Sequence, residues 1–246
     1  MPYTAMTEEV EPTVIALFGD SITLGFHEVN HPFAGGLPGA NGSTSFSFVP
    51  NLFLRNLLDG EPKRTSIVVN WGVGGSDSLS GVNRIASNLS STKATHAGKK
   101  YFVLIMYGTN DLGVGIGTST TAFNIGLMID AANLVQFEPI VGTLTPRSDF
   151  SVIPYNSTIS STANSKSTFV VDHYNHFIDY QPGGWKALID VETDFQENLI
   201  RLHPNDEGYM VIAQAWFDDR LAALIEEDFI PPPPITLPWL MLILDD

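Results

Sequence analysis

The 246-residue sequence contains no cysteine. This absence excludes disulfide bonds, thiolate metal sites and a cysteine nucleophile. Basic residues are also scarce: 12 Lys and Arg stand against 27 Asp and Glu, which gives a net charge of −15. Nucleic acids and anionic membrane surfaces are bound mainly through positive charge. We therefore expect no nucleic-acid partner.

Long apolar runs are absent as well. No segment approaches the roughly 18–20 consecutive apolar residues that a membrane span needs, so we expect no stable membrane insertion. Residues 1–12 lack the basic segment followed by an apolar one that marks a signal peptide. A secreted or periplasmic bacterial protein would look the same after removal of its signal peptide. The sequence leaves cellular location and oligomeric state open.

Strand-like and helix-like patterns alternate along the chain. Short apolar runs predict five strands, at 13–18, 65–70, 100–107, 139–144 and 167–172. Apolar residues at helical spacing predict helices, most clearly at 76–90, 122–137 and 206–227. This alternation predicts an α/β fold, a three-layer α/β/α sandwich with a central, mostly parallel, five-stranded sheet.

We expect one domain over residues 13–229, preceded by an N-terminal arm (1–12) and followed by a tail (230–246). The hydrophobic content of 43% suffices for a core of that size. In the tail, Pro231–Pro234 predicts a stiff spacer, and the apolar run after it is interrupted by Pro238. We interpret the tail as a terminal segment that docks on the surface or stays disordered, or as the remnant of a sorting or anchoring signal.

Three predicted strands end in turns that carry reactive or hydrogen-bonding groups. Gly19–Ser21 follows the first strand, Gly72–Gly75 the second and Gly108–Asp111 the third. In a parallel sheet these turns share one edge, where α/β proteins place their ligands and reactive groups. By itself, Ser21 is either a helix cap or a nucleophile.

A serine nucleophile needs a base within hydrogen-bond reach and donors aimed at the developing oxyanion. His203, just before the last predicted helix, is the candidate base. The candidate oxyanion donors are the backbone N–H of Gly75 and the side-chain amide of Asn110. Each residue alone has an ordinary structural explanation, but their order on successive strand ends favours a hydrolytic site.

These segments resemble the sequence blocks of the SGNH (GDSL-type) hydrolases, a family of esterases, lipases and carbohydrate deacetylases. The matching blocks are GDSITLG (19–25), NWGVGG (70–75), GTND (108–111) and LHPNDEGY (202–209). The resemblance runs from about Val14 to the last helix. It implies a flavodoxin-like sandwich and a cofactor-independent serine esterase for small-molecule esters with short acyl chains. A carbohydrate O-deacetylase of the same family is the alternative.

Position by position, the resemblance implies that Ser21 is the nucleophile and His203 the general base. It also implies an oxyanion hole formed by the backbone N–H groups of Ser21 and Gly75 and the amide of Asn110. The family usually has an aspartate three residues before the histidine, and here that position is Ile200. In serine proteases, losing the charge behind the histidine costs about 10⁴ in kcat.

Three interpretations of this departure follow. A backbone carbonyl orients His203 in a Ser–His dyad, or an acid from nearby takes over, with Glu197 and Asp194 the nearest upstream. Alternatively, the protein is a catalytically impaired binding module. We favour the dyad or the displaced acid, since every other catalytic position is intact and a binder has no use for an oxyanion hole.

A competing motif lies at His27, Glu28 and His31, which satisfy the His-Glu-x-x-His pattern of zinc peptidases. That chemistry needs both histidines on one face of a stable helix. Pro32 disfavours helical geometry at His31, and glycines flank the segment on both sides. We therefore expect no metal and interpret residues 26–50 as a long loop that forms a wall near Ser21.

Overall fold

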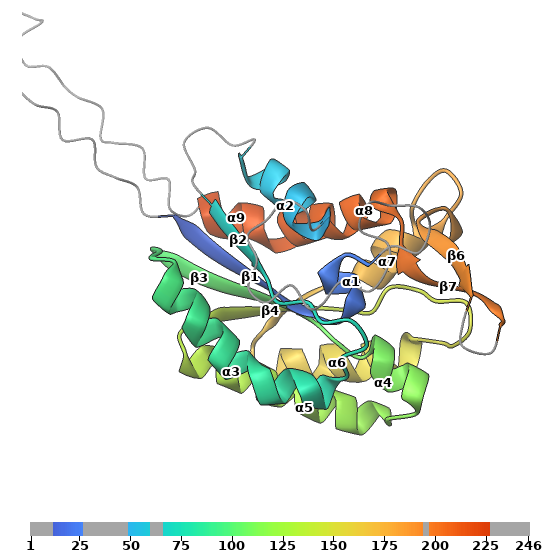
Figure 1. The fold of residues 1–246 in the computed structure, drawn as a ribbon, viewed down its shortest axis with the longest axis horizontal. Coiled ribbons are helices and arrows are strands. Elements are labelled where there is room, and N and C mark those ends of the chain that lie inside the picture. Colours follow the sequence, from blue (N-terminus) through green and yellow to red (C-terminus); the bar gives the residue numbers. More distant parts are fainter. Residues whose placement is uncertain (1–11, 27–48, 60–65, 194–196, 227–246) are drawn as a thin grey trace, which may run out of the picture.

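A computed structural model of the chain describes residues 12–26, 49–59, 66–193 and 197–226. At its centre is a parallel sheet of five strands in the order β2-β1-β3-β4-β5 (Figure 1). The strands are β1 (Thr13–Gly19), β2 (Ser66–Asn70), β3 (Lys100–Met106), β4 (Glu138–Gly142) and β5 (Phe169–Val171). The predicted α/β/α sandwich with a five-stranded parallel sheet is confirmed.

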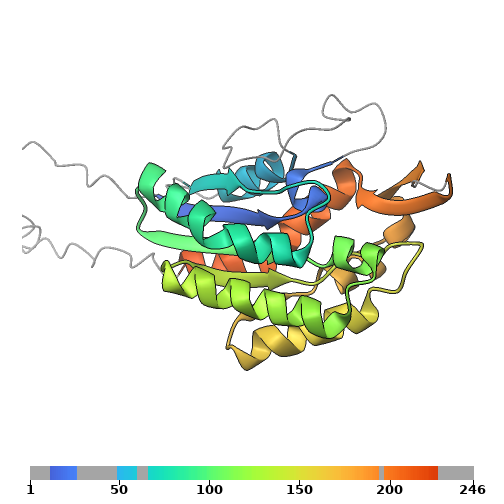
Figure 2. The ribbon, with the colours of Figure 1, turned by 60° about the horizontal axis from the view of Figure 1, so that its bottom comes forward.

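Both faces of the sheet are covered by helices because successive strand residues point to opposite sides. In β1, Ile15 and Leu17 pack into one buried cluster, and Ala16 and Phe18 into the other. The first cluster includes residues of α2 (Val49–Asp59), α7 (His173–Ile178), α8 (Asp206–Trp216) and α9 (Ala222–Glu226). The second is covered by α3 (Ser78–Thr95), α5 (Thr118–Leu134) and α6 (Ile153–Ser165), and Figures 1 and 2 show the two layers.

Helix boundaries differ from the prediction after the third strand. A helix was predicted over residues 122–137, yet α5 (Thr118–Leu134) already starts at Thr118 and a further short helix, α4 (Thr109–Val114), precedes it. Gly115 ends α4 because it adopts a left-handed conformation, with φ of 80°. The expected last helix is present as α8, a π-helical turn (Phe217–Leu221) and α9. In the described ranges, no helix has the length and apolarity needed to cross a membrane.

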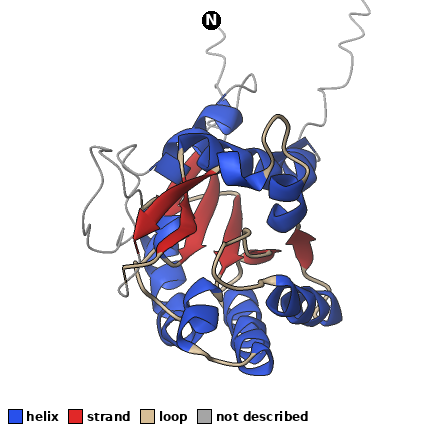
Figure 3. Ribbon diagram, turned by 90° about the vertical axis from the view of Figure 1, so that its right-hand side faces the viewer, coloured by secondary structure: helices blue, strands red, loops and turns tan. Residues whose placement is uncertain are grey.

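A second, smaller sheet lies at residues 189–204, where no strand was predicted, and a short helix precedes it. The short helix is a 3-10 turn, η1 (Trp185–Ala187). It is followed by the antiparallel pair β6 (Ile189–Thr193) and β7 (Leu199–Pro204), visible in Figures 1 and 3. These strands have no long apolar run, so their pairing could not be inferred from periodicity.

Candidate active site

The serine identified from the sequence lies at the carboxyl end of β1, where α1 (Ser21–Leu24) begins. Asp20 caps this short helix, because its Oδ1 accepts the backbone N–H of Ile22 at 3.0 Å. Gly25 ends the helix in a left-handed conformation with φ of 89°. The tight turn from β1 into α1 places Ser21 at the edge of the sheet, where only 7% of its surface is exposed.

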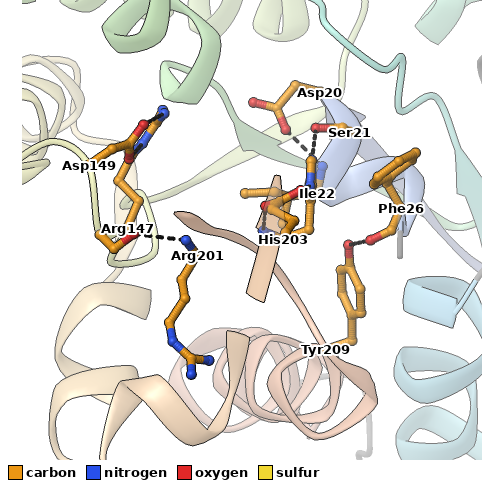
Figure 4. A network of polar contacts seen from close by, with 11 residues as sticks. Asp20, Ser21, Ile22, Phe26, Arg147, Asp149, Arg201, His203 and Tyr209 are labelled. Carbon is orange, nitrogen blue, oxygen red and sulfur yellow. Dashed lines mark hydrogen bonds and ion pairs between the residues drawn. The ribbon is translucent and has the colours of Figure 1, made fainter. Parts of the chain in front are cut away.

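His203 lies next to Ser21 although 182 positions separate the two residues in the chain. The Ser21 Oγ and the His203 Nε2 are 2.8 Å apart, which is hydrogen-bonding distance (Figure 4). Strand β7 carries His203, and Phe26 packs on the imidazole with ring centroids 4.6 Å apart. Tyr209 holds Phe26 in turn, by donating its hydroxyl to the Phe26 carbonyl at 2.8 Å. The predicted nucleophile and base therefore meet.

The group behind His203 is Glu192, a residue that sequence reasoning did not name. Its Oε2 lies 2.7 Å from His203 Nδ1, and its Oε1 accepts the His203 backbone N–H at 2.9 Å. This two-point contact fixes both the ring and its strand. The dyad interpretation is thereby corrected. Of the two acids suggested from the sequence, Glu197 is exposed and does not take this place, and Asp194 lies outside the described residues.

The hairpin register explains how the acid reached this position. Glu192 on β6 pairs directly with Ile200 on β7. Side chains of directly opposed residues lie on the same face of an antiparallel pair, about 4.5–5.5 Å apart at Cβ. The carboxylate therefore comes from the strand facing Ile200, the position at which the resemblance led us to expect an aspartate. Ile200 is 9% exposed and lines the pocket next to His203.

The two other predicted oxyanion donors lie at the same edge of the sheet. Gly75 is in the turn after β2 with φ of +70°, a conformation that side chains rarely adopt. Asn110 is in the first turn of α4, and its Nδ2 donates to the Ser76 carbonyl at 2.9 Å, so the second and third turns are joined. Close packing also requires Gly72, because a Cβ there would lie 2.2 Å from the Leu24 backbone nitrogen.

Two buried carboxylates, Asp20 and Asp111, support this edge of the sheet. Asp111 is fully buried, and it accepts the Ser78 backbone N–H at 2.9 Å, the Ser78 hydroxyl at 2.5 Å and the Thr121 hydroxyl at 2.9 Å. It therefore anchors α4 to the start of α3. Asp20 is 1% exposed, and burial raises its pKa to about 6, an effect that its bond from Ile22 only partly offsets.

A pocket of about 700 Å³ opens beside His203, between α4, the segment 147–150 and the β6–β7 hairpin. Arg147 in its wall makes a bidentate ion pair with Asp149, at 2.6 Å for both bonds, and donates to the Thr109 carbonyl at 2.8 Å. Figure 4 shows this pair beside the Ser21–His203 centre. The pocket is lined by Phe26, Thr109, Asn110, Gly113, Val114, Arg147, Asp149, Phe150, Glu192, Thr193, Asn198, Ile200, Leu202 and His203.

Among residues 12–26, 49–59, 66–193 and 197–226, no group of three or more histidine, aspartate or glutamate side chains is placed to hold a metal ion. The His27, Glu28 and His31 motif lies outside the described residues, and so do residues 27–48 of the expected loop.

Two residues that support the site were missed for different reasons. Glu192 belongs to a strand pair, and the only available signal was the alternation of apolar and polar residues in 189–193. Arg147 follows β4 in a segment without a recognisable motif, and it is held in the pocket wall by its bonds to Asp149 and to the Thr109 carbonyl. The contact of Glu192 with His203 and that of Arg147 with the Thr109 carbonyl both join distant parts of the chain, so local sequence does not indicate them.

Comparison with known proteins gives a family match over most of the chain. Residues 17–211 match the family model described as the GDSL-like Lipase/Acylhydrolase family. A search of curated proteins gave no match.

Solved structures share the fold at low sequence identity. The lipase/acylhydrolase from Enterococcus faecalis has a TM-score of 0.63 and 18% identity, over 86% of this chain and 96% of that chain. A putative lipolytic protein of the G-D-S-L family from Desulfitobacterium hafniense has a TM-score of 0.58 and 19% identity, over 82% and 96%. The acetylxylan esterase Axe2 from Geobacillus stearothermophilus has a TM-score of 0.60 and 16% identity, over 85% and 94%.

Proposed function

Because this chain belongs to the GDSL-like lipase/acylhydrolase family, we propose that it hydrolyses carboxylic esters through an acyl-enzyme on Ser21. The observation that carries this proposal is the continuous chain of hydrogen bonds from Ser21 through His203 to Glu192. A hydroxyl, an imidazole and a buried carboxylate in this order form the nucleophile, base and orienting acid of serine hydrolases.

In the first half of the reaction, the Ser21 Oγ attacks the ester carbonyl carbon as its proton passes to His203 Nε2. The carbonyl oxygen becomes an oxyanion, stabilised by the N–H groups of Ser21 and Gly75 and by the Asn110 amide. Glu192 keeps the remaining imidazole proton on Nδ1 and stabilises the imidazolium. The oxyanion then collapses and breaks the bond between the carbonyl carbon and the alkoxide oxygen, which takes the Nε2 proton from His203 and departs as the alcohol.

In the second half, His203 accepts a proton from a water molecule, which attacks the carbonyl carbon of the acyl-enzyme. Collapse of the second oxyanion breaks the bond to the Ser21 Oγ and returns the proton to it. The products are the carboxylic acid and regenerated enzyme. No step calls for a cofactor, since each proton moves between Ser21, His203 and substrate or water.

We propose uncharged esters with short acyl chains as substrates. The one cation in the described wall of the pocket, Arg147, is already paired with Asp149, so it offers little attraction to an anionic substrate. The remaining wall combines apolar side chains such as Val114 and Phe150 with amides such as Asn198. This mixture also favours a second candidate, an O-acetylated carbohydrate, in keeping with the likeness to an acetylxylan esterase.

The test is an activity series with wild-type protein and the Ser21→Ala variant. p-Nitrophenyl esters from acetate to octanoate would be compared with acetylated xylo-oligosaccharides. We expect turnover of acetate and butyrate by the wild type and none by Ser21→Ala, with an organophosphate label mapping to Ser21 alone. Preferred deacetylation of the sugar would select the second candidate.

Two results would contradict the proposal. Activity that survives Ser21→Ala but disappears with a chelator would indicate the zinc motif at His27, Glu28 and His31. Binding of acetylated sugars without turnover of any ester would indicate a binding module.

A further inference from the structure

One arginine side chain contacts the ends of the three strands that carry the site. Arg84 lies on α3, which covers the sheet on the face opposite α2 and α8 (Figure 1). We propose that Arg84 is a positioning residue that holds the turns of Ser21, Gly75 and Asn110 in the arrangement that stabilises the oxyanion. The inference rests on the proposed serine mechanism and adds to it a residue that touches no substrate.

The hydrogen bonds of Arg84 reach one residue at each of these strand ends. Its Nη2 donates to the Gly19 carbonyl at 2.8 Å, two residues before Ser21. Its Nη1 donates to the Trp71 carbonyl at 2.7 Å, at the start of the turn that leads to Gly75. Nη2 also bonds the hydroxyl of Tyr107, three residues before Asn110. The guanidinium group of Arg84 thus connects the carboxyl ends of β1, β2 and β3, at the points where the turns that carry Ser21, Gly75 and Asn110 begin.

Tyr107 carries this connection on to the oxyanion donors themselves. Its hydroxyl lies 3.3 Å from the Ser76 Oγ, and Ser76 directly follows Gly75. The Ser76 carbonyl accepts the amide of Asn110 at 2.9 Å. Burial raises the pKa of Tyr107 to about 12, so the phenol keeps its proton at neutral pH and can bond on both sides. A displacement of the Arg84 side chain would therefore change the positions of both Gly75 and Asn110.

The guanidinium shape is what this position needs. The central carbon of the guanidinium lies over the Phe18 ring, 4.5 Å from the ring centroid. This cation–π contact helps to hold the fork in place, and its two terminal nitrogens donate to carbonyls at the ends of different strands. A lysine has one nitrogen on a flexible stem and cannot reproduce this geometry. Lysine substitution is therefore a stringent test of positioning against simple charge.

The experiment measures kcat and KM for p-nitrophenyl butyrate in Arg84→Lys and Arg84→Gln, beside wild type and Ser21→Ala. We expect kcat to fall about 10- to 100-fold in both Arg84 variants with KM within about twofold, since oxyanion donors act in the transition state. In a further variant, Arg84→Ala, added guanidinium at millimolar concentration should restore part of the activity, because it can occupy the space of the missing side chain. Ile85→Ala, a neighbouring buried position on the same helix, serves as the matched destabilised control and should keep its kcat.

The outcomes separate this inference from the proposed function. Equal activity of wild type and Ser21→Ala would overturn the serine mechanism itself. A dead Ser21→Ala with fully active Arg84 variants would overturn only the role of Arg84, as would an equal loss in Ile85→Ala. Should the Arg84 variants fail to fold, Tyr107→Phe decides, because it removes the hydroxyl that links Arg84 to Ser76 and leaves the bonds from Arg84 to the Gly19 and Trp71 carbonyls in place. It should lower kcat by about threefold or more, and an unchanged kcat would overturn the inference.

Discussion

Replacing Glu192 with glutamine tests how His203 is held, and it changes charge with almost no change in size. The Glu192 carboxylate accepts two hydrogen bonds from His203, one from the backbone N–H and one from the ring. A glutamine can keep the first with its carbonyl oxygen. Its NH₂ group then faces Nδ1 and can only donate. Nδ1 must therefore accept, and the imidazole proton moves to Nε2.

That tautomer cannot take the proton of Ser21, because the Nε2 that faces the Ser21 Oγ at 2.8 Å already carries one. The corresponding loss in serine proteases is about 10⁴ in kcat. Glu192 is only 6% exposed, so after its charge is removed little water can reach His203 to stabilise the imidazolium in its place. We expect Glu192→Gln to lower kcat by about 10³- to 10⁴-fold, which at 1.36 kcal/mol per tenfold is about 4–5.5 kcal/mol in the barrier.

The assay is steady-state hydrolysis of p-nitrophenyl butyrate, with thermal unfolding to confirm that each variant is folded. Glu197→Gln is the matched control, since it makes the same chemical change at an exposed glutamate close by. It should stay within about twofold of wild type, as surface substitutions usually do. A Glu192→Gln enzyme within tenfold of wild type, or an equal loss in Glu197→Gln, would refute the orienting role.

A rescue variant strengthens the test. Ile200 is paired directly with Glu192 in the hairpin, so an aspartate at position 200 starts from the facing strand. In the double variant Glu192→Gln/Ile200→Asp, we expect at least tenfold recovery of kcat over Glu192→Gln alone, about 1.4 kcal/mol. No recovery in a folded double variant would mean that only the β6 strand can hold the acid.

Three further predictions follow from the burial and bonding of the site and core. Asn110→Ala should lower kcat about 10²- to 10³-fold with a smaller effect on KM, as loss of an oxyanion donor does, and single-turnover acylation kinetics would show it. For Asp20, burial raises the pKa from 3.8 to about 6, so the fold loses stability as the pH rises from about 4 to 6, and the loss is complete above pH 6. Asp20→Asn should therefore stabilise by about 3 kcal/mol at pH 8 and about half that at pH 5 in urea unfolding; an equal gain at both would contradict this. His173 is fully buried, and in the part of the chain that the structure describes neither of its ring nitrogens has a hydrogen-bond partner; burial lowers its pKa from 6.5 to about 3. The unfolded chain then binds the extra proton, so wild type should lose about 2 kcal/mol more than His173→Leu between pH 7 and pH 5, and parallel stability curves would contradict it.

Much of the fold was predictable because its signals are local. Apolar runs such as 13–18 and 100–107 have the length and bounds of buried strands, and the alternation of strands and helices permits few other arrangements. The helix boundaries near Gly115 and the hairpin 189–204 were not predictable. They depend on a left-handed turn and on pairing between strands that have little apolar character of their own.

For the site, the sequence alone pointed to Ser21, His203, Gly75 and Asn110, since each lies in a short motif on a recognisable turn. Tertiary structure decided what holds them. Glu192 reaches His203 only through the register of β6 on β7, and a slip of one residue would turn its side chain to the other face. Arg84 meets Gly19 across 65 positions. A motif shows which chemical groups lie at the end of a strand. Which residues contact those groups depends on how distant segments of the chain pack together, and local sequence does not determine that packing.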